Sequence, residues 1–290
     1  MDKCYRCSLI KNEQKNRSSL IIKGLCLLLL LTVWILSGSI QARAATEKKS
    51  SAKSTTSAAK KKTGWIKKDG YFYYYNEEKK KAAGYVTIGD KKYLFDSKGR
   101  QKTGWRKVGK NVRYFQIQNG PGGYLVTGKN VNGVKLDEKG VAKSSAGVKE
   151  KISLLLRFQK LADRLVRPGT PRKTKLYKVF MYARSRSFRE TGNAPHTKHW
   201  DQWHARCFLE LGSVDCVMAA CGFGYLANAI GYKNITVKLY GHGHCEINKL
   251  CYDPSIAKTL PPSQYTQYYG RKYSEVPRLW TGPKVDTRKI

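Results

Sequence analysis

Long hydrophobic runs are rare in this chain of 290 residues. Only residues 25–40, LCLLLLLTVWILSGSI, could cross a membrane, and this run is long for a signal peptide but short for a comfortable transmembrane helix. A basic segment precedes it, and Ala42-Arg43-Ala44, an A-x-A cleavage pattern, follows. We therefore expect residues 1–44 to form a signal peptide or a signal anchor. The protein is expected to be secreted, with a membrane as partner only if this segment stays uncleaved.

Acidic residues are also scarce. The chain has 20 Asp and Glu against 56 Lys and Arg, so its formal net charge is +36. Such an excess draws a protein to polyanions, and the export signal favours a cell-wall glycan or an anionic wall polymer over nucleic acid. Residues 45–62 are rich in Lys, Ser, Thr and Ala without apolar periodicity, which predicts a basic disordered linker.

The spacing of paired zinc ligands is missing from the His/Cys cluster near the C-terminus. His242, His244, Cys245 and Cys251 show neither Cys-x-x-Cys nor His-x-x-x-His, which argues against structural zinc. No metal and no cofactor are expected. Cleavage after residue 44 would leave five of the eight cysteines. An odd number is compatible with one free thiol and up to two disulfides, or with no disulfide.

A repeat of about twenty residues fills residues 63–142. Its copies open at Thr63-Gly64-Trp65, Ala83-Gly84-Tyr85 and Thr103-Gly104-Trp105, and Thr127-Gly128 follows after an insertion. Each of the first three openings precedes an aromatic strand. Since a single hairpin cannot bury its aromatic side chains, we expect the copies to stack into a β-hairpin solenoid.

This repeat resembles the cell-wall and glucan-binding repeats of secreted proteins from Gram-positive bacteria, including the choline-binding type. The resemblance implies that aromatic side chains bind a wall ligand, and it points to Trp65, Tyr74, Tyr85 and Trp105. Lys92 occupies the position of Phe72 in the second copy, and Arg113 replaces an aromatic residue in the third. General wall attachment is therefore a safer expectation than choline binding. The alternative is that the aromatic residues only hold the solenoid together.

Helical periodicity begins near Val148. Apolar residues recur with helical spacing over 152–165, 176–187 and 200–211. A fourth such stretch begins at Cys216, and Asp215 before it is a good helix N-cap. A thiol on the first helical turn is a good nucleophile, since free backbone N–H groups there stabilise a thiolate and an oxyanion.

A hairpin is expected after this helix. Ile235, Val237 and Leu239 alternate with polar residues, and His242, His244 and Glu246 continue the even-numbered face. A turn at Asn248-Lys249 would bring back Leu250-Cys251-Tyr252, which ends at Asp253-Pro254. The hairpin can present an imidazole and a carboxylate to Cys216. Helices followed by a hairpin predict an α+β domain over residues 143–290.

Residues 213–255 resemble the core of the transglutaminase-like superfamily of papain-type cysteine enzymes. The resemblance rests on Cys216 at a helix start and on a series of residues that follow it. That series comprises Phe223, Leu226, Gly231, His242, Glu246-Ile247-Asn248 and Tyr252-Asp253-Pro254. The resemblance implies a papain-like transglutaminase core with Cys216 as nucleophile, His242 as base and Asp253 as the residue that orients the imidazole.

Two positions depart from the superfamily pattern. His244 stands where Trp is common, so His244 remains an alternative to His242. The oxyanion donor is often an upstream Trp or Gln, for which Trp200, Gln202 and Trp203 are candidates.

The expected function is that of a secreted, wall-associated cysteine acyltransferase or hydrolase, which forms a thioester with a Gln carboxamide or a peptide carbonyl. A cross-linking transglutaminase and a cysteine peptidase are both compatible with the sequence. The other readings are a papain-type cell-wall endopeptidase and a wall-binding protein without catalysis.

Overall fold

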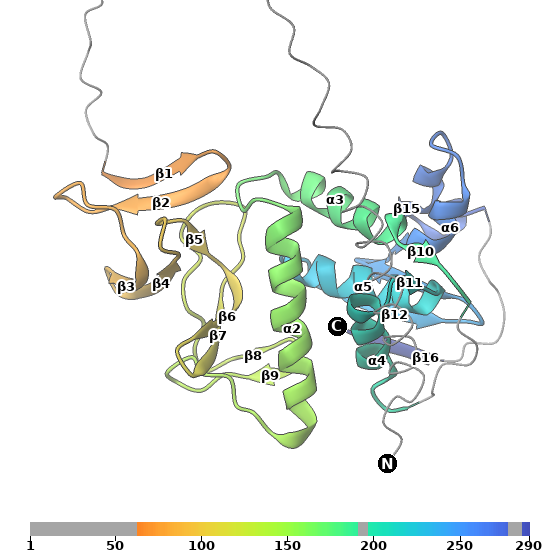
Figure 1. Cartoon of the computed structure of the whole chain (residues 1–290), viewed down its shortest axis with the longest axis horizontal. Coiled ribbons are helices and arrows are strands. Elements are labelled where there is room, and N and C mark those ends of the chain that lie inside the picture. The colour runs from red at the N-terminus through yellow and green to blue at the C-terminus, as the bar shows by residue number, and fades with distance from the viewer. Residues whose placement is uncertain (1–62, 191–196, 278–285) are drawn as a thin grey trace, which may run out of the picture. The chain divides into compact units, whose positions relative to one another are not determined.

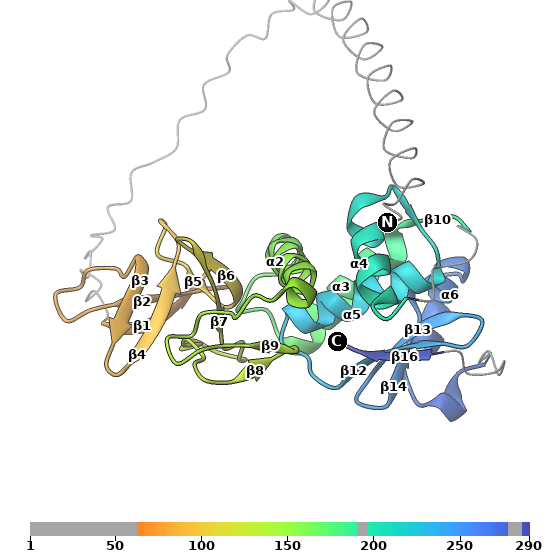
Figure 2. The ribbon, with the colours of Figure 1, turned by 90° about the horizontal axis from the view of Figure 1, so that it is seen from below.

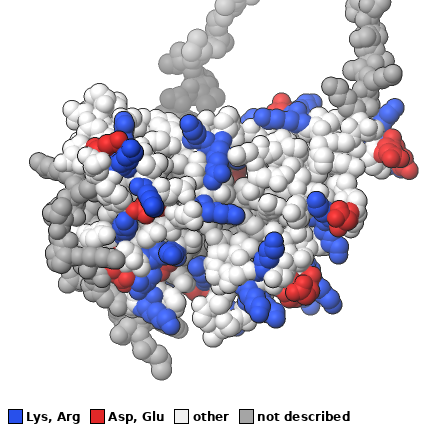
Figure 3. Space-filling model, turned by 180° about the vertical axis from the view of Figure 1, so that it is seen from behind, with Lys and Arg blue, Asp and Glu red and all other residues white. Residues whose placement is uncertain are grey.

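The computed structural model describes residues 63–190, 197–277 and 286–290. The predicted signal segment 1–44 and linker 45–62 lie outside these residues. Among the residues described, no helix is long and apolar enough to cross a membrane. Lys and Arg predominate over Asp and Glu on the face shown in Figure 3, in keeping with the composition.

Three regular β-hairpins and one short hairpin occupy the N-terminal half of the described chain (Figure 1). The first three begin at Gly64, Gly84 and Gly104, which confirms the twenty-residue period. Strand Gln101–Lys102 (β5) joins the second hairpin. The hairpin strands are β1 (Gly64–Lys68), β2 (Tyr71–Tyr75), β3 (Gly84–Ile88), β4 (Lys91–Phe95), β6 (Gly104–Val108), β7 (Asn111–Phe115), β8 (Asn130–Val131) and β9 (Val134–Lys135).

Turn chemistry sets the register of these hairpins. Lys68 pairs with Tyr71 across a two-residue turn in which Asp69 and Gly70 both have positive φ, 51° and 76°. Two consecutive positive φ angles are typical of a type I′ turn, whose twist matches that of the strands. The register places Trp65 opposite Tyr74 and Trp105 opposite Tyr114. The first and third hairpins thereby each pair two aromatic side chains, whereas Tyr85 of the second hairpin lies opposite Leu94.

The C-terminal half is an α+β unit. Helices α2 (Ala146–Leu165), α3 (Arg172–Ser185) and α4 (Trp200–Glu210) precede α5 (Cys216–Ala229), and each confirms a helix expected from apolar spacing. The short strands β10 (Ser187–Phe188) and β11 (Ser213–Val214) pair in parallel. Helix α5 is buried from Val217 to Ala229, so it forms the centre of this half.

A five-stranded antiparallel sheet lies on one side of α5 (Figure 2), with the order β15-β14-β13-β12-β16. Its strands are β12 (Ile235–Leu239), β13 (Gly243–Ile247), β14 (Leu250–Tyr252), β15 (Tyr269–Arg271) and β16 (Asp286–Lys289). Helix α6 (Pro254–Thr259) and two 3₁₀ turns, Tyr265–Tyr268 and Tyr273–Glu275, complete the unit.

The path of the chain between residues 235 and 247 corrects the sequence expectation. A single strand was expected to run from Ile235 past His244, but the chain reverses at Gly241, whose φ is 74°. The Tyr240 N–H donates to the His242 carbonyl across this turn. Lys238 now lies opposite His244 and Thr236 opposite Glu246, so these residues still share a face. His242 lies in the turn and therefore does not share that face.

Gln159 of α2 connects the third hairpin to α5. Its side-chain oxygen accepts from the Trp105 N–H at 3.3 Å, and its amide nitrogen donates to the Ala229 carbonyl at 3.1 Å. Gly104 permits this approach, because a Cβ there would stand 1.9 Å from the Gln159 oxygen. Arg106 and Asp163 form an ion pair beside it. The third hairpin is therefore packed directly against α2.

Candidate functional site

Cys216 opens helix α5. The Asp215 carboxylate accepts a hydrogen bond from the Met218 N–H at 2.7 Å and caps the helix. Of the cysteines in the described residues, Cys207, Cys221, Cys245 and Cys251 are buried, and Cys216 alone is half-buried. Cys216 therefore combines a place at a helix N-terminus with access to solvent.

Gly243 brings strand β13 against the first turn of α5. A Cβ at Gly243 would stand 2.6 Å from the Val217 Cα and 2.9 Å from its backbone nitrogen. Both are backbone atoms and cannot move aside as a side chain can. The missing side chain therefore allows the turn that carries His242 to approach Cys216.

Gly243→Ala is expected to lower the reactivity of Cys216 toward alkylating agents by at least about tenfold and to destabilise the fold by about 1–3 kcal/mol, because the new methyl group separates β13 from α5. Alkylation kinetics and thermal unfolding measure the two effects. Gly147→Ala is the matched control, since a Cβ at Gly147 meets nothing within 4 Å. An unchanged alkylation rate in Gly243→Ala would show that the close approach does not position the imidazole.

His242 links Cys216 to Asp253. Its Nε2 donates to Asp253 Oδ2 at 2.6 Å. Burial opposes the imidazolium and on its own lowers the pKa of His242. Hydrogen bonds with Asp253 and Cys216 and the charges of both groups outweigh burial and raise the pKa to about 10. The pair therefore favours a charged imidazole beside the sulfur.

Asp253 combines two structural roles. Oδ1 accepts from the N–H groups of Ser255 and Ile256, both at 3.0 Å, and from the Ser255 hydroxyl at 2.7 Å, so this oxygen caps α6. Oδ2 remains for His242. Burial on its own raises the pKa of Asp253, but the hydrogen bonds and the charge of His242 keep it lowered. The carboxylate is thus held charged and in a fixed orientation.

His244 lies on the even-numbered face of the sheet, away from this group. Its Nε2 is 3.2 Å from the Tyr273 hydroxyl, and its ring stacks on Tyr240 with centroids 5.8 Å apart. Burial lowers the pKa of His244 to about 4. The structure brings His242, and not His244, together with Cys216 and Asp253.

The other cysteines are poor nucleophiles. Burial raises the pKa of Cys221 and of Cys245 well above the ordinary thiol value, and it raises that of Cys251 to about 12. A thiol that stays protonated and inaccessible reacts slowly.

The three candidate oxyanion donors lie at the start of α4. Trp200 donates its indole N–H to Asp286 Oδ2 at 2.9 Å, and the Gln202 amide nitrogen lies 3.3 Å from His199 Nδ1. Trp203 packs its ring edge-on against His204. The Trp200 proton is committed elsewhere, so an oxyanion role stays a prediction for Gln202 and Trp203. The backbone N–H groups at the start of α5 are the alternative donors.

An aromatic group forms a partial box between the first and second hairpins. Trp65 lies edge-on to Tyr74 of its own hairpin and to Tyr93 of the next, each with centroids 5.4 Å apart. Phe95 stacks at 5.8 Å. Trp65 and Tyr74 were expected from the sequence, but Tyr93 was missed. The recurrence of an aromatic strand in the second hairpin is the signal that could have identified Tyr93.

The other two expected wall-binding residues have different surroundings. The Arg113 guanidinium lies over the Tyr85 ring, 5.5 Å from its centroid, where an external cation would otherwise sit. Trp105 is only 2% exposed, and its indole N–H donates to Asn132 at 3.2 Å. The expectation that Trp105 contacts a ligand is therefore corrected: this ring has no free face. Trp65 and Tyr74 are the partly exposed pair.

The second and third hairpins match a known family. Residues 82–121 match the model of the choline-binding repeat. This part of the chain therefore contains hairpin repeats of the choline-binding type. No curated protein matches the sequence.

Solved structures similar to the hairpins come from Streptococcus pneumoniae. Choline-binding protein F is 25% identical and covers 29% of this chain, with a TM-score of 0.26. CbpJ is 28% identical over 28% of this chain, also with a TM-score of 0.26. In both cases 27% of the relative's own length is matched. The choline-binding domain of Spr1274 is 26% identical, and 96% of it aligns to 29% of this chain, with a TM-score of 0.25.

The family match at residues 82–121 does not include the C-terminal part of the chain, so the transglutaminase-like character of that part remains a prediction. Within the described ranges, no three His, Cys, Asp or Glu side chains come together in a way that could hold a metal ion.

Proposed function

We propose that the hairpin module attaches this protein to a bacterial cell-wall polymer. The observation that carries the proposal is the choline-binding repeat at residues 82–121 beside the box of Trp65, Tyr74 and Tyr93. Aromatic rings attract quaternary ammonium groups through the negative faces of their π-systems, and Trp65 and Tyr74 are partly exposed. The ligand class proposed for this box is therefore a choline-type cation carried by a wall polymer.

Trp65→Ala is expected to weaken retention of the full chain on purified choline-bearing walls, and to weaken binding of free choline, by at least about tenfold. Wall pull-down and choline titration measure the two effects. Phe188→Ala, at an aromatic residue that is 47% exposed, is the matched control. Wall retention should weaken but survive at about 1 M salt, because screening removes charge attraction and leaves the aromatic contacts. Equal retention of Trp65→Ala and the unchanged protein would contradict the assigned box.

A second function is favoured by the contacts of Cys216. We propose that Cys216, His242 and Asp253 carry out acyl transfer. The thiolate attacks a Gln carboxamide or peptide carbonyl, and His242 donates its proton to the leaving nitrogen as the tetrahedral species collapses to a thioester. Water or an amine then resolves the thioester, with His242 taking up the proton of the attacking group.

What supports this second proposal is the 2.6 Å bond from His242 to Asp253 in combination with the hydrogen bond of His242 to Cys216. A thiol-reactive probe that modifies Cys216 no faster than the buried cysteines would contradict it. The wall-binding module would then be the whole function.

A further inference from the structure

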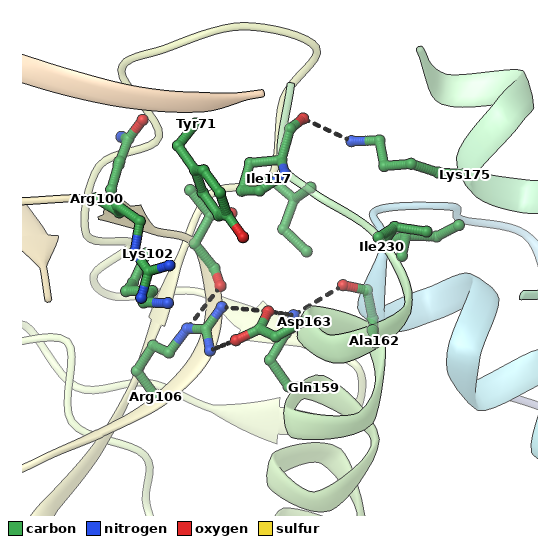
Figure 4. Close-up of a pocket in the computed structure, with 15 residues that line it drawn as sticks. Tyr71, Arg100, Lys102, Arg106, Ile117, Gln159, Ala162, Asp163, Lys175 and Ile230 are labelled. Atoms are coloured by element: carbon green, nitrogen blue, oxygen red, sulfur yellow. Dashed lines mark hydrogen bonds and ion pairs between the residues drawn. The ribbon is translucent and has the colours of Figure 1, made fainter. Parts of the chain in front are cut away.

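A hollow whose charged lining residues are mostly cations lies where the hairpins meet α2 and α3 (Figure 4), apart from both the aromatic box and Cys216. Its volume is about 140 Å³, enough for one compact oxyanion and its bound water. Four cationic side chains, Arg100, Lys102, Arg106 and Lys175, line it together with the carboxylate of Asp163.

Three of these cations are partly neutralised. Arg106 donates to Asp163, with Nη2 at 2.9 Å from Oδ1. Arg100 and Lys102 share the Asp96 carboxylate, at 2.8 Å and 3.3 Å. Four positive and two negative groups leave a charge of +2 around the hollow. That charge matches one or two negative charges on an incoming group.

Lys175 is the unusual member of this group. It is 4% exposed, and its ammonium donates to the Pro168 carbonyl at 3.1 Å. In the described part of the chain no carboxylate forms an ion pair with it. Burial, and then the charge of Arg172, lower the pKa of Lys175. A buried charge without a counter-charge is costly, and an anion in the hollow would offset that cost.

A second hollow continues the first. It has a volume of about 680 Å³ and shares Tyr71, Asp163 and Val166 with its neighbour. Its walls add four further cations and no further carboxylate. These cations are Lys67, Arg164, Arg167 and Lys178. A group of positive charges next to a buried one suits a polymer that carries several anionic groups.

The single aromatic ring shared by both hollows is covered. The guanidinium of Arg100 lies over Tyr71 at 4.9 Å and that of Arg167 at 5.7 Å. Single-stranded nucleic acid is normally held by bases stacked on open aromatic faces. The covered ring favours a polymer that presents phosphates without bases.

We propose that the two hollows bind consecutive phosphate groups of a phosphodiester polymer, with one phosphate against Lys175 and the next ones along α2 and α3. This site requires neither the aromatic box nor Cys216. Charge-assisted hydrogen bonds from Lys and Arg to phosphate oxygens are the contacts that hold the polymer.

The test measures binding of the full chain to a fluorescent synthetic poly(glycerol phosphate), with free choline present so that the aromatic box does not contribute. Lys175→Gln is expected to weaken binding about tenfold. Lys149→Gln removes the same charge at an exposed position of α2 and should change binding less than about twofold. Inorganic phosphate should raise the melting temperature of the unchanged protein and not that of Lys175→Gln.

A second variant tests the site even if Lys175→Gln fails to fold. Arg164 and Lys178 are exposed, so the double change Arg164→Gln, Lys178→Gln leaves the core intact and is expected to weaken polymer binding at least about threefold. Equal weakening by Lys149→Gln would show that binding depends only on the overall charge of the protein, and it would overturn the site. Tighter binding to a single-stranded oligonucleotide of equal charge, or to anionic lipid vesicles, would also overturn the proposed partner. Loss of choline binding in Trp65→Ala with polymer binding retained would keep the two sites distinct.

Discussion

Replacement of Cys216 by Ala is expected to lower acyl transfer by at least about a thousandfold while leaving the fold intact, because the change removes one sulfur atom at a half-buried helix start. The same variant should lose the fast phase of iodoacetamide labelling. In the unchanged protein Cys216 should react at least about a hundredfold faster than Cys221, whose pKa burial raises and whose side chain solvent does not reach. Peptide mass spectrometry identifies the labelled residue.

Cys221→Ala is the control for this first prediction. The residue lies five positions further along the same helix, and it should retain most of the activity and all of the fast labelling. Equal loss of activity in both variants, with both folded, would show that the nucleophile has been misplaced.

His242→Ala is expected to slow alkylation of Cys216 at neutral pH by about a hundredfold, because the imidazolium that stabilises the thiolate is lost. His244→Ala should change the rate less than about threefold, since its ring contacts Tyr240 and Tyr273 on another face. Alkylation rates measured from pH 5 to pH 11 compare the two variants. The reverse ranking would transfer the role to His244.

The same imidazole should leave a signature in stability. Because the folded pKa of His242 is about 10 and the unfolded value about 6.5, its contribution is fully present below about pH 6.5 and is lost as the pH rises through about 10. The difference in melting temperature between the unchanged protein and His242→Ala should therefore shrink over that range. A difference that stays constant from pH 6 to pH 10 would contradict the ion pair with Asp253.

Much of the fold follows from periodicity. The starts of α4 and α5 and the end of α2 coincide with the predicted helices, because apolar residues at helical spacing must face one core. The turn at Gly241 was missed because residues 235–246 keep an alternation of period two through it. Alternation reports which face a side chain occupies but not the direction of the chain. Strands β15 and β16 come from a Tyr-rich tail without clear periodicity, and only tertiary contacts reveal them.

The site was less accessible to sequence reasoning than the fold. Cys216 and Asp253 follow from their local patterns, but the choice between His242 and His244 depends on the reversal at Gly241, which sends the two rings to different neighbours. In the structure Asp253 both caps α6 and bonds to His242, through separate oxygens. Nothing in the sequence indicates that the ammonium of Lys175 is buried, because a Lys within a basic helix is ordinarily exposed.

The Gln159 amide has a consequence for how such modules can be exchanged. A gene fusion cut after residue 142 would leave the Gln159 side-chain oxygen without the Trp105 N–H and the Asp163 carboxylate without Arg106, and it would expose the Gly104 backbone that α2 now covers. The unit of transplantation should therefore extend through α2. A purification tag or chimaera made from residues 63–142 alone would expose the surface that α2 covers, and exposed apolar surface favours aggregation.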